Sequence, residues 1–276
     1  ELAAAREVGC MDPELRLDAL DEYLVYRFIP SPGTPFRNTW KMPPGHYVRI
    51  PLGALPEEPR FERFETRFEP SVLPKTEDEW GEALRSGLAA AVERQLMSDV
   101  PVGVLLSGGV DSPGVSRVMR DCMTEPPQAF AVGFSDHAGV DELKAARAAA
   151  QALGLPLKDV GVTSAYLEVW LDLVSRVGEP ISDYGSLLVA VLCRKVRETH
   201  KVVLTGQGAD EPLGGYARHF AERFYPAARR LGPVLDLLPE RVGASDRVAR
   251  ARRIARVSDR AQRFTEIMAV FAPQEV

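Results

Sequence analysis

From Thr76 onward, continuous apolar runs alternate with stretches of helical periodicity, and this alternation limits the folds open to the chain more than any other feature. The apolar runs are VGVLL at 102–106, AFAVGF at 129–134 and VVLT at 202–205, and a further strand is expected at 157–160. The helical stretches begin near Ser112 and cover 141–153, about 164–177 and 186–199. Apolar strands separated by helices are typical of a parallel sheet covered on both faces. We therefore predict an α/β fold whose ligand lies beyond the carboxyl ends of the strands.

A long helix is predicted just before the first of these strands. Thr76 and Glu79 have the spacing of a capping box, in which each side chain accepts from the backbone of the other. The apolar face expected to follow carries Trp80, Leu84, Leu88 and Ala91.

The first 71 residues do not continue this strand and helix pattern. They are predicted to form the tail of a separate α+β domain, followed by the α/β domain at 72–276. A helix is expected within 13–28, with Leu17, Leu20, Leu24 and Phe28 on one face. The segments 46–50 and 61–68 alternate apolar with polar residues, which predicts a small antiparallel β element. Residues 69–75, with two prolines, are the expected linker.

The net charge argues against a nucleic-acid partner. The 276 residues include 34 Lys and Arg against 39 Asp and Glu, a formal charge of −5, so no global basic field is available to hold a phosphate backbone. No apolar run reaches the roughly 18 residues that would span a bilayer, and the opening residues lack a signal-peptide pattern. We therefore expect a cytoplasmic protein that binds neither membrane nor nucleic acid.

Cysteines, histidines and clustered arginines do not indicate a further site. Cys10, Cys122 and Cys193 form no C-x-x-C pair and are expected to be buried or half-buried free thiols. The four histidines show no H-x-x-x-H spacing. An arginine-rich stretch at 247–263 could suggest an anion patch, but apolar residues recur there at helical spacing, so we expect its arginines to form the solvated face of amphipathic helices. These arginines are Arg247, Arg250, Arg252, Arg253, Arg256, Arg260 and Arg263, and the apolar residues are Ile254, Val257, Ala261, Phe264 and Met268.

The loop after the first predicted strand is Ser107-Gly108-Gly109-Val110-Asp111-Ser112. Its glycines allow backbone N–H groups to approach an anion, its serines add hydroxyl donors, and the following helix contributes a positive N-terminus. Asp111 would repel a bare phosphate, so its presence favours Mg²⁺ as a partner of the phosphates. A tight turn with a helix cap would use the same residues. The sequence contains neither G-x-x-x-x-G-K-S/T nor G-x-G-x-x-G, so the common phosphate-binding motifs are absent.

A second glycine-rich loop, from Thr205 to Tyr216, follows the VVLT strand. Because parallel strands end at one edge of their sheet, this loop is expected to lie opposite Ser107–Ser112. Its acids Asp210 and Glu211 could share a cation with the phosphates, or could simply favour the start of a helix.

Both loops together resemble the asparagine synthetase family, which shows an S-G-G-x-D-S loop and, later, a glycine-rich loop ending D-E-x-x-G-G-Y. The LLSGGVDS string is also similar to the pyrophosphate loop of the wider N-type ATP pyrophosphatase group. Three further segments match the family: the AFAVGF strand, Glu179-Pro180 with Asp183, and the acidic pair Asp141-Glu142. Upstream, Tyr23-Leu24, Ile29-Pro30 and Lys41-Met42-Pro43-Pro44-Gly45-His46 resemble the end of the family's glutaminase domain. The resemblance covers most of residues 15–220.

This resemblance implies an adenine-nucleotide α-hydrolase-like fold, preceded by the tail of a glutamine amidotransferase domain. It also implies a ligase that adenylates a carboxylate with ATP, releases pyrophosphate and lets ammonia displace AMP. The expected products are those of asparagine synthesis from aspartate, with ammonia drawn from glutamine. The expected partners are therefore small molecules, with a homodimer as one possible assembly. The expected ATP or pyrophosphate contacts are Leu105, Ser107, Gly108, Gly109, Asp111, Ser112, Val132, Thr205 and Gly206, and the expected Mg²⁺ ligands are Asp111 and Asp210.

Three departures from the family pattern modify these expectations. The chain opens at Glu1 without the family's N-terminal cysteine nucleophile, so glutamine hydrolysis is not expected of it. Gln207 stands where the family has an acid, and an amide cannot act as a general base; no catalytic residue is therefore assigned. The chain stops at Val276, before the family's late catalytic lysine, so an internal fragment is expected that does not make asparagine by itself. Two other functions stay open: a β-lactam-forming or peptide-modifying ligase of the same family, and a nucleotide-binding paralogue without catalysis.

Overall fold

The structure is a computed structural model that describes residues 2–12, 14–53, 58–64, 73–134, 142–162, 167–236 and 252–269. These residues belong to two compact units. The first comprises Glu1–Phe64, Val177–Ser182 and Asp210–Val276, and the second Glu65–Arg176 and Asp183–Ala209. The division into domains at residue 72 stays a prediction. Of the predicted features, Asp141, Arg247, Arg250 and residues 65–68 lie outside the described residues.

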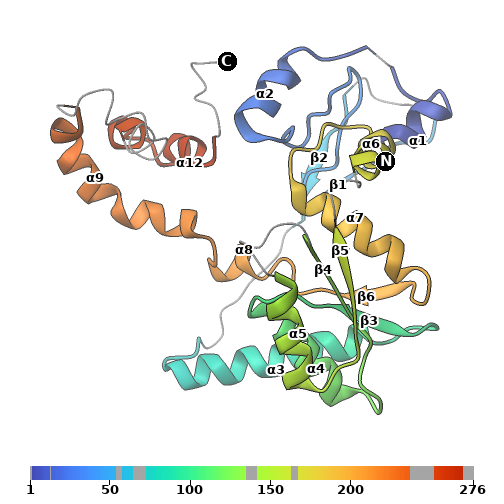
Figure 1. Ribbon diagram of the computed structural model, residues 1–276. Helices are drawn as coiled ribbons and strands as arrows, with labels where there is room; N and C mark the ends of the chain where they lie inside the picture. The colour runs from blue at the N-terminus through green and yellow to red at the C-terminus, as the bar shows by residue number, and fades with distance from the viewer. Residues whose placement is uncertain are drawn as a thin grey trace. The chain divides into compact units, whose positions relative to one another are not determined.

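The second unit is built on a four-stranded sheet (Figure 1). Its strands are β3 (Val102–Leu105), β4 (Ala129–Phe134), β5 (Leu157–Val162) and β6 (Val202–Leu204). They lie in the order β5-β4-β3-β6, and every neighbouring pair is parallel. The predicted parallel sheet is therefore confirmed, with strands close to those expected from the apolar runs.

Helices cover both faces of this sheet (Figure 1). One face carries α3 (Glu77–Gln95), α4 (Asp111–Cys122) and α5 (Glu142–Leu153), and the other carries α6 (Leu167–Val177) and α7 (Tyr184–Val196). Alternate residues of β4 point to the two sides: Ala129 and Ala131 pack toward α4 and α5, whereas Phe130 packs against α7. This two-sided burial explains why the strands read as continuous apolar runs.

The capping box at the start of α3 is present. The Glu79 N–H donates to Thr76 Oγ1 at 3.2 Å, and the Thr76 N–H donates to Glu79 Oε2 at 3.2 Å. The predicted apolar face was only half right, because Leu88 packs against the core while Trp80 and Leu84 are exposed. The α3 residues that pack in the described core, Leu88 and Val92, lie in the second half of the helix.

The first unit contains α1 (Leu2–Glu7) and α2 (Asp18–Tyr26), followed by a two-stranded antiparallel sheet of β1 (His46–Val48) and β2 (Phe61–Arg63). This confirms the small antiparallel element expected between residues 46 and 68. The unit also contains the 3₁₀ turn η2 (Ala217–Phe220) and the helices α8 (Asp210–Leu213), α9 (Ala221–Asp236) and α12 (Arg260–Met268). Among the described residues, no helix has both the length and the apolarity to cross a bilayer.

The apolar face predicted for α2 was wrong. Leu17, Leu20, Leu24 and Phe28 are all exposed. The helix buries Ala19 and Val25 instead, and it ends at Tyr26, because Arg27 has a left-handed φ of 65° and leaves Phe28 outside the helix. A short helix that is apolar on more than one side leaves some of those side chains in water when only one side meets the rest of the unit.

Two further expectations about exposure were wrong. Arg263, expected on a solvated helix face, is only 6% exposed, while Phe264 is exposed. The buried guanidinium is compensated by hydrogen bonds to the Val257 and Ser258 carbonyl oxygens at 3.2 and 2.5 Å, and it lies 3.7 Å from the centre of the Tyr225 ring. The three cysteines, expected to be at least half buried, are all exposed.

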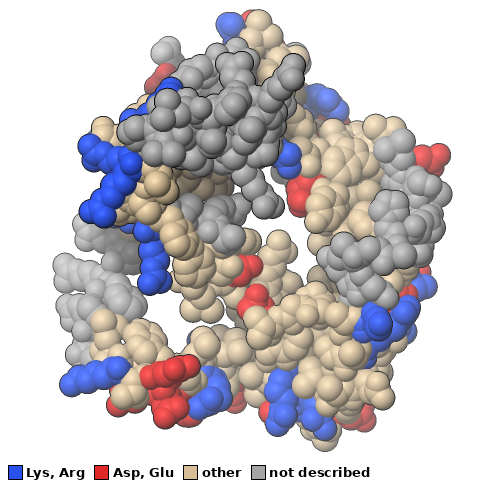
Figure 2. Space-filling view, turned by 60° about the vertical axis from the view of Figure 1, so that its left-hand side comes forward, with Lys and Arg blue, Asp and Glu red and all other residues tan. Residues whose placement is uncertain are grey.

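Charged side chains occur in small groups on the face shown in Figure 2. Both signs are present there.

Candidate functional site

The strand order places a change of direction between β3 and β6. After β3, the chain continues to β4 and β5 on one side of β3, and it then crosses to β6 on the other side. In open parallel sheets, ligands bind outside the carboxyl ends of the strands at such a switch point. The two loops that leave this edge, after β3 and after β6, are the two glycine-rich loops identified from the sequence.

The first loop is folded around Ser112. The Ser107 N–H donates to Ser112 Oγ at 2.8 Å, and the two serine hydroxyl oxygens are also 2.8 Å apart. The Gly109 N–H donates to Ser107 Oγ at 3.3 Å. Ser112 is 7% exposed, whereas Ser107, Gly108 and Gly109 are exposed. A buried serine therefore holds an exposed glycine loop in place.

The loop opens into the N-terminus of α4. Val110 is the residue before the helix, and within the described part of the chain no side chain caps this terminus. The first N–H groups of an α-helix lack partners inside the helix and carry the positive end of its dipole. The N-terminus of α4 therefore presents donors suited to an anion. Asp111 supplies a carboxylate within the same turn.

Gly108 lets the first loop lie against α5. A Cβ placed on Gly108 would overlap Ala145 Cβ. In contrast, a Cβ on Gly109 would make an ordinary 3.5 Å contact with Ser107 Oγ. The two adjacent glycines therefore have different roles: one is required for packing, and the other leaves room in front of the loop.

Gly206 brings the second loop against the first. A Cβ on Gly206 would lie 2.5 Å from the Ser112 nitrogen and 2.7 Å from the Asp111 carbonyl carbon. Contacts this short never occur for a real Cβ, so the backbone passes here at a distance that only glycine permits. The loops after β3 and β6 therefore meet at the N-terminus of α4, which confirms that they lie at the same end of the sheet.

The other predicted residues of the second unit lie within the strands of the sheet or directly after β6. Leu105 ends β3, Val132 lies within β4, and both are partly buried on the α7 side of the sheet. Thr205 follows β6, and its Oγ1 accepts a hydrogen bond from the Gln207 N–H at 3.2 Å. Gln207 itself is exposed.

Asp210 belongs to the first unit, where α8 begins. A Cβ on Gly215 would overlap the Asp210 carboxylate, and the Gly215 N–H donates to the Asp210 carbonyl oxygen at 2.9 Å. The paired glycines at 214–215 thus let the chain fold back onto Asp210. Its role as a Mg²⁺ ligand stays a prediction.

The Asp111 carboxylate is suited to bind Mg²⁺ only when phosphate oxygens supply further ligands. In the described residues, no three or more His, Cys, Asp or Glu side chains gather into a metal site. Magnesium is commonly held by one or two carboxylates together with substrate phosphates. A single carboxylate beside an uncapped helix terminus fits that arrangement.

One contact within the first unit was missed by the sequence reasoning. Lys41 Nζ donates to Glu179 Oε2 at 2.7 Å and to the Ile29 carbonyl oxygen at 2.8 Å. Both charged side chains are partly buried. Each residue lies in a segment that had been compared with the family, but nothing in the sequence indicates that positions 138 residues apart form an ion pair.

The sequence of this chain is similar to those of several known proteins. The family model described as asparagine synthase matches residues 83–275. A glutamine-hydrolysing asparagine synthetase of Bacillus subtilis is 30% identical over 209 residues, which are 74% of this chain and 32% of that protein. The amidase chyE of Penicillium rubens is 29% identical over 66% of this chain and 29% of its own length. This chain thus spans about a third of the length of these curated relatives.

Among solved structures, a glutamine-dependent NAD⁺ synthetase from Acinetobacter baumannii in complex with ADP matches 57% of this chain and 30% of its own. The TM-score is 0.38 at 22% identity.

Proposed function

Because this chain belongs to the asparagine synthase family, we propose that it carries the ATP-cleaving site of an amide-forming ligase. The observation that carries the proposal is the contact between Gly206 and the backbone of Asp111 and Ser112, which unites two glycine-rich loops at the switch point of a parallel sheet. The reaction is adenylation of a substrate carboxylate, followed by attack of ammonia on the acyl-adenylate.

The residues of the first loop suit a triphosphate that is cleaved between its α- and β-phosphates. The exposed Gly108 backbone and the uncapped N-terminus of α4 offer N–H donors to the departing pyrophosphate. Donors fixed by the hydrogen bonds around Ser112 need little rearrangement as negative charge develops, which is the condition for stabilising a transition state. Leu105, Val132 and Gly206 are the proposed contacts of the adenosine part, and Thr205 is a further proposed ATP contact.

Magnesium, if held by Asp111 and Asp210 as proposed, would neutralise phosphate charge and orient the leaving pyrophosphate. The chain's own contribution is the Asp111 carboxylate at the head of α4, directly after the exposed glycines.

Aspartate is the proposed acyl substrate, because asparagine synthetases are prominent among the relatives. Gln207 favours one alternative, a β-lactam-forming or peptide-modifying ligase of the same family. Its exposed amide cannot remove a proton as a carboxylate would. Use of ATP also supports the cytoplasmic location expected from the sequence.

Binding of Mg·ATP to the 276-residue chain tests the nucleotide site. Asp111→Asn should weaken Mg·ATP binding, measured by titration calorimetry, by about 10-fold or more, since a charged ligand is worth roughly 1.5–3 kcal/mol. Asp121→Asn is the matched control, because Asp121 lies near the other end of α4 and pairs with Arg117. Equal affinities of the two variants would refute the assignment of Asp111.

Exchange of labelled pyrophosphate into ATP tests the substrate. Measured on the whole gene product, exchange that depends on aspartate supports asparagine synthesis. Exchange that depends on another carboxylic acid supports the alternative ligase, whereas ATP binding without exchange under any condition indicates a silent paralogue.

A further inference from the structure

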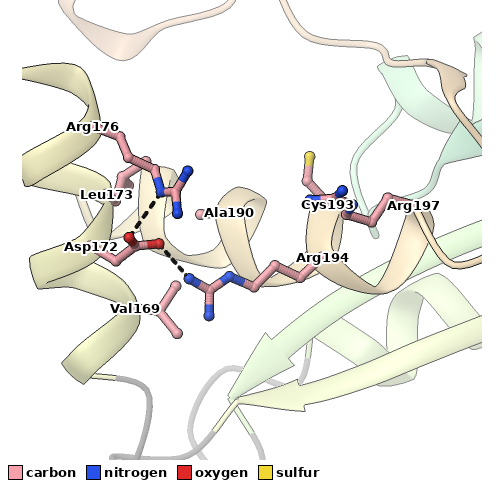
Figure 3. A pocket seen from close by; sticks show the side chains of 8 residues that line it. All are labelled: Val169, Asp172, Leu173, Arg176, Ala190, Cys193, Arg194 and Arg197. Atoms are coloured by element: carbon pink, nitrogen blue, oxygen red, sulfur yellow. Dashed lines mark hydrogen bonds and ion pairs between the residues drawn. The ribbon is translucent and has the colours of Figure 1, made fainter. Parts of the chain in front are cut away.

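A groove of about 260 Å³ lies between α6 and α7 in the second unit (Figure 3). Arg176 lines it from α6, Cys193 and Arg194 line it from α7, and Arg197 lines it from the residue that follows α7. The opposite side of α7 buries Val191, Leu192 and Val196 against the sheet. The groove therefore occupies the outer side of this helix pair, and none of its lining residues belongs to the two glycine-rich loops.

The groove carries an excess of positive charge. Asp172 accepts from Arg176 Nε at 2.8 Å and from Arg194 at 2.6 Å. These interactions, with the hydrogen bond from Arg176 as the largest, hold the pKa of Asp172 below its ordinary value of 3.8, so this carboxylate is ionised at neutral pH. Three arginines against one aspartate leave two uncompensated positive charges.

Arg197 is the most available of these cations. Among the described residues, it has no acidic partner, whereas Arg176 and Arg194 share Asp172. The neighbouring ion pair between Lys195 and Glu198, 2.7 Å apart, is neutral in sum and does not change this balance. Arginine binds carboxylates through two parallel hydrogen bonds, so Arg197 is suited to a small carboxylate-bearing ligand.

The same groove contains a free thiol. Cys193 is exposed and lies four residues before Arg197, which places both side chains on one face of α7. Figure 3 shows the two side chains next to each other. A molecule whose carboxylate is held by Arg197 would thus bring its other end near Sγ of Cys193.

We infer that this groove is a modification site, at which Cys193 exchanges with a small disulfide whose halves carry carboxylates. The ionised thiol attacks one sulfur of the reagent, the reagent's S–S bond breaks, and a new S–S bond joins Cys193 to one half. The other half leaves as a thiolate with the electron pair of the broken bond and takes a proton from water. No further oxidant is needed, because the incoming disulfide is itself the oxidant.

Accessibility alone does not single out Cys193, since Cys10 and Cys122 are also exposed. Neither of those two cysteines lines the groove. The site is therefore distinguished by its preference for an anionic reagent, and Cys122, in the same unit, is the internal reference. This inference is independent of the proposed function.

The test compares oxidised glutathione, which is anionic, with cystamine, which is cationic, on the intact chain at low ionic strength. Mass spectrometry follows the modification rate at each cysteine, and the ratio of the two reagents' rates at Cys193 is divided by the same ratio at Cys122. One unit charge pair at about 6 Å in water changes a rate by roughly threefold. The quotient should therefore be about 10 and should fall as salt is added.

Arg197→Gln should lower this quotient about 10-fold, because the lost charge no longer speeds the anionic reagent or slows the cationic one. Lys201→Gln removes the same charge from an exposed position outside the groove and should leave the quotient unchanged. A quotient near one in the unmodified sequence, or an Arg197→Gln quotient equal to that of Lys201→Gln, overturns the inference. Circular dichroism of each variant checks that the fold is retained, and a Cys193 that reacts with neither reagent also overturns it.

Discussion

Replacing Gly206 by alanine tests the meeting of the two loops directly. The added Cβ would lie 2.5, 2.7 and 2.8 Å from three backbone atoms of Asp111 and Ser112, so no side-chain rotation can relieve the overlap. The loops must therefore separate by at least 3.0 minus 2.5, or 0.5 Å, and by 3.4 minus 2.5, or 0.9 Å, to restore an ordinary contact. Forcing backbone apart in a packed region costs about 1–3 kcal/mol.

The functional effect should exceed the loss of stability. A displacement of about 1 Å in a binding constellation can lower activity by roughly 10²-fold. The assay is Mg·ATP titration by calorimetry, with urea unfolding measured in parallel. We expect Mg·ATP affinity to fall by about 10- to 100-fold, while the unfolding free energy falls by about 1–3 kcal/mol.

Gly87→Ala is the matched control. Gly87 lies in α3, and a Cβ there would meet nothing within 4 Å. This change should raise stability by about 0.5–1 kcal/mol and leave ATP affinity as it was. Wild-type stability and affinity in Gly206→Ala would show that the loops do not meet. A loss of stability without a loss of ATP affinity would show that the loops meet but that their contact does not contribute to nucleotide binding.

Three further outcomes follow from particular contacts. Gly108→Ala should lower ATP affinity more than Gly109→Ala, because only the first Cβ overlaps α5; equal calorimetric affinities would contradict this. Burial lowers the pKa of His200 below its ordinary 6.5. The unfolded chain therefore binds a proton at His200 more readily, and stability is lost as pH falls below about 6.5. Urea unfolding across pH 7.5 to 5 should show a smaller decline in His200→Gln, and an unchanged decline would exclude His200 as its source. Lys41→Met should cost about 1–3 kcal/mol, since Glu179 would lose its partner while partly buried; the double variant with Glu179→Gln should recover part of this loss.

Local signals predicted much of the fold because they depend on neighbours in sequence. The capping box of Thr76 and Glu79 needs only a three-residue separation, and it is present. The apolar runs at 102–106 and 129–134 became β3 and β4 because residues buried on both faces must be apolar wherever helices cover both sides. The two glycine-rich loops were located correctly at strand ends for the same reason.

Exposure was predicted less well because it depends on distant partners. The periodicity of Leu20 and Leu24 shows where a helix could bury an apolar face, but no other element covers that face in the described residues. Arg263 is buried because carbonyl groups and the Tyr225 ring happen to surround it. Neither outcome can be read from spacing along the chain.

The sequence by itself determined that a parallel sheet forms and that glycine-rich loops with an acid follow two of its strands. Only the tertiary structure decided that β6 pairs with β3, which places those loops together at the switch point. It also decided that Gly206 meets the N-terminus of α4, and that an exposed thiol shares a groove with three arginines. The physical reason is that apolar burial and turn chemistry are written in local patterns, whereas strand order and close approaches arise from packing between segments far apart in the chain.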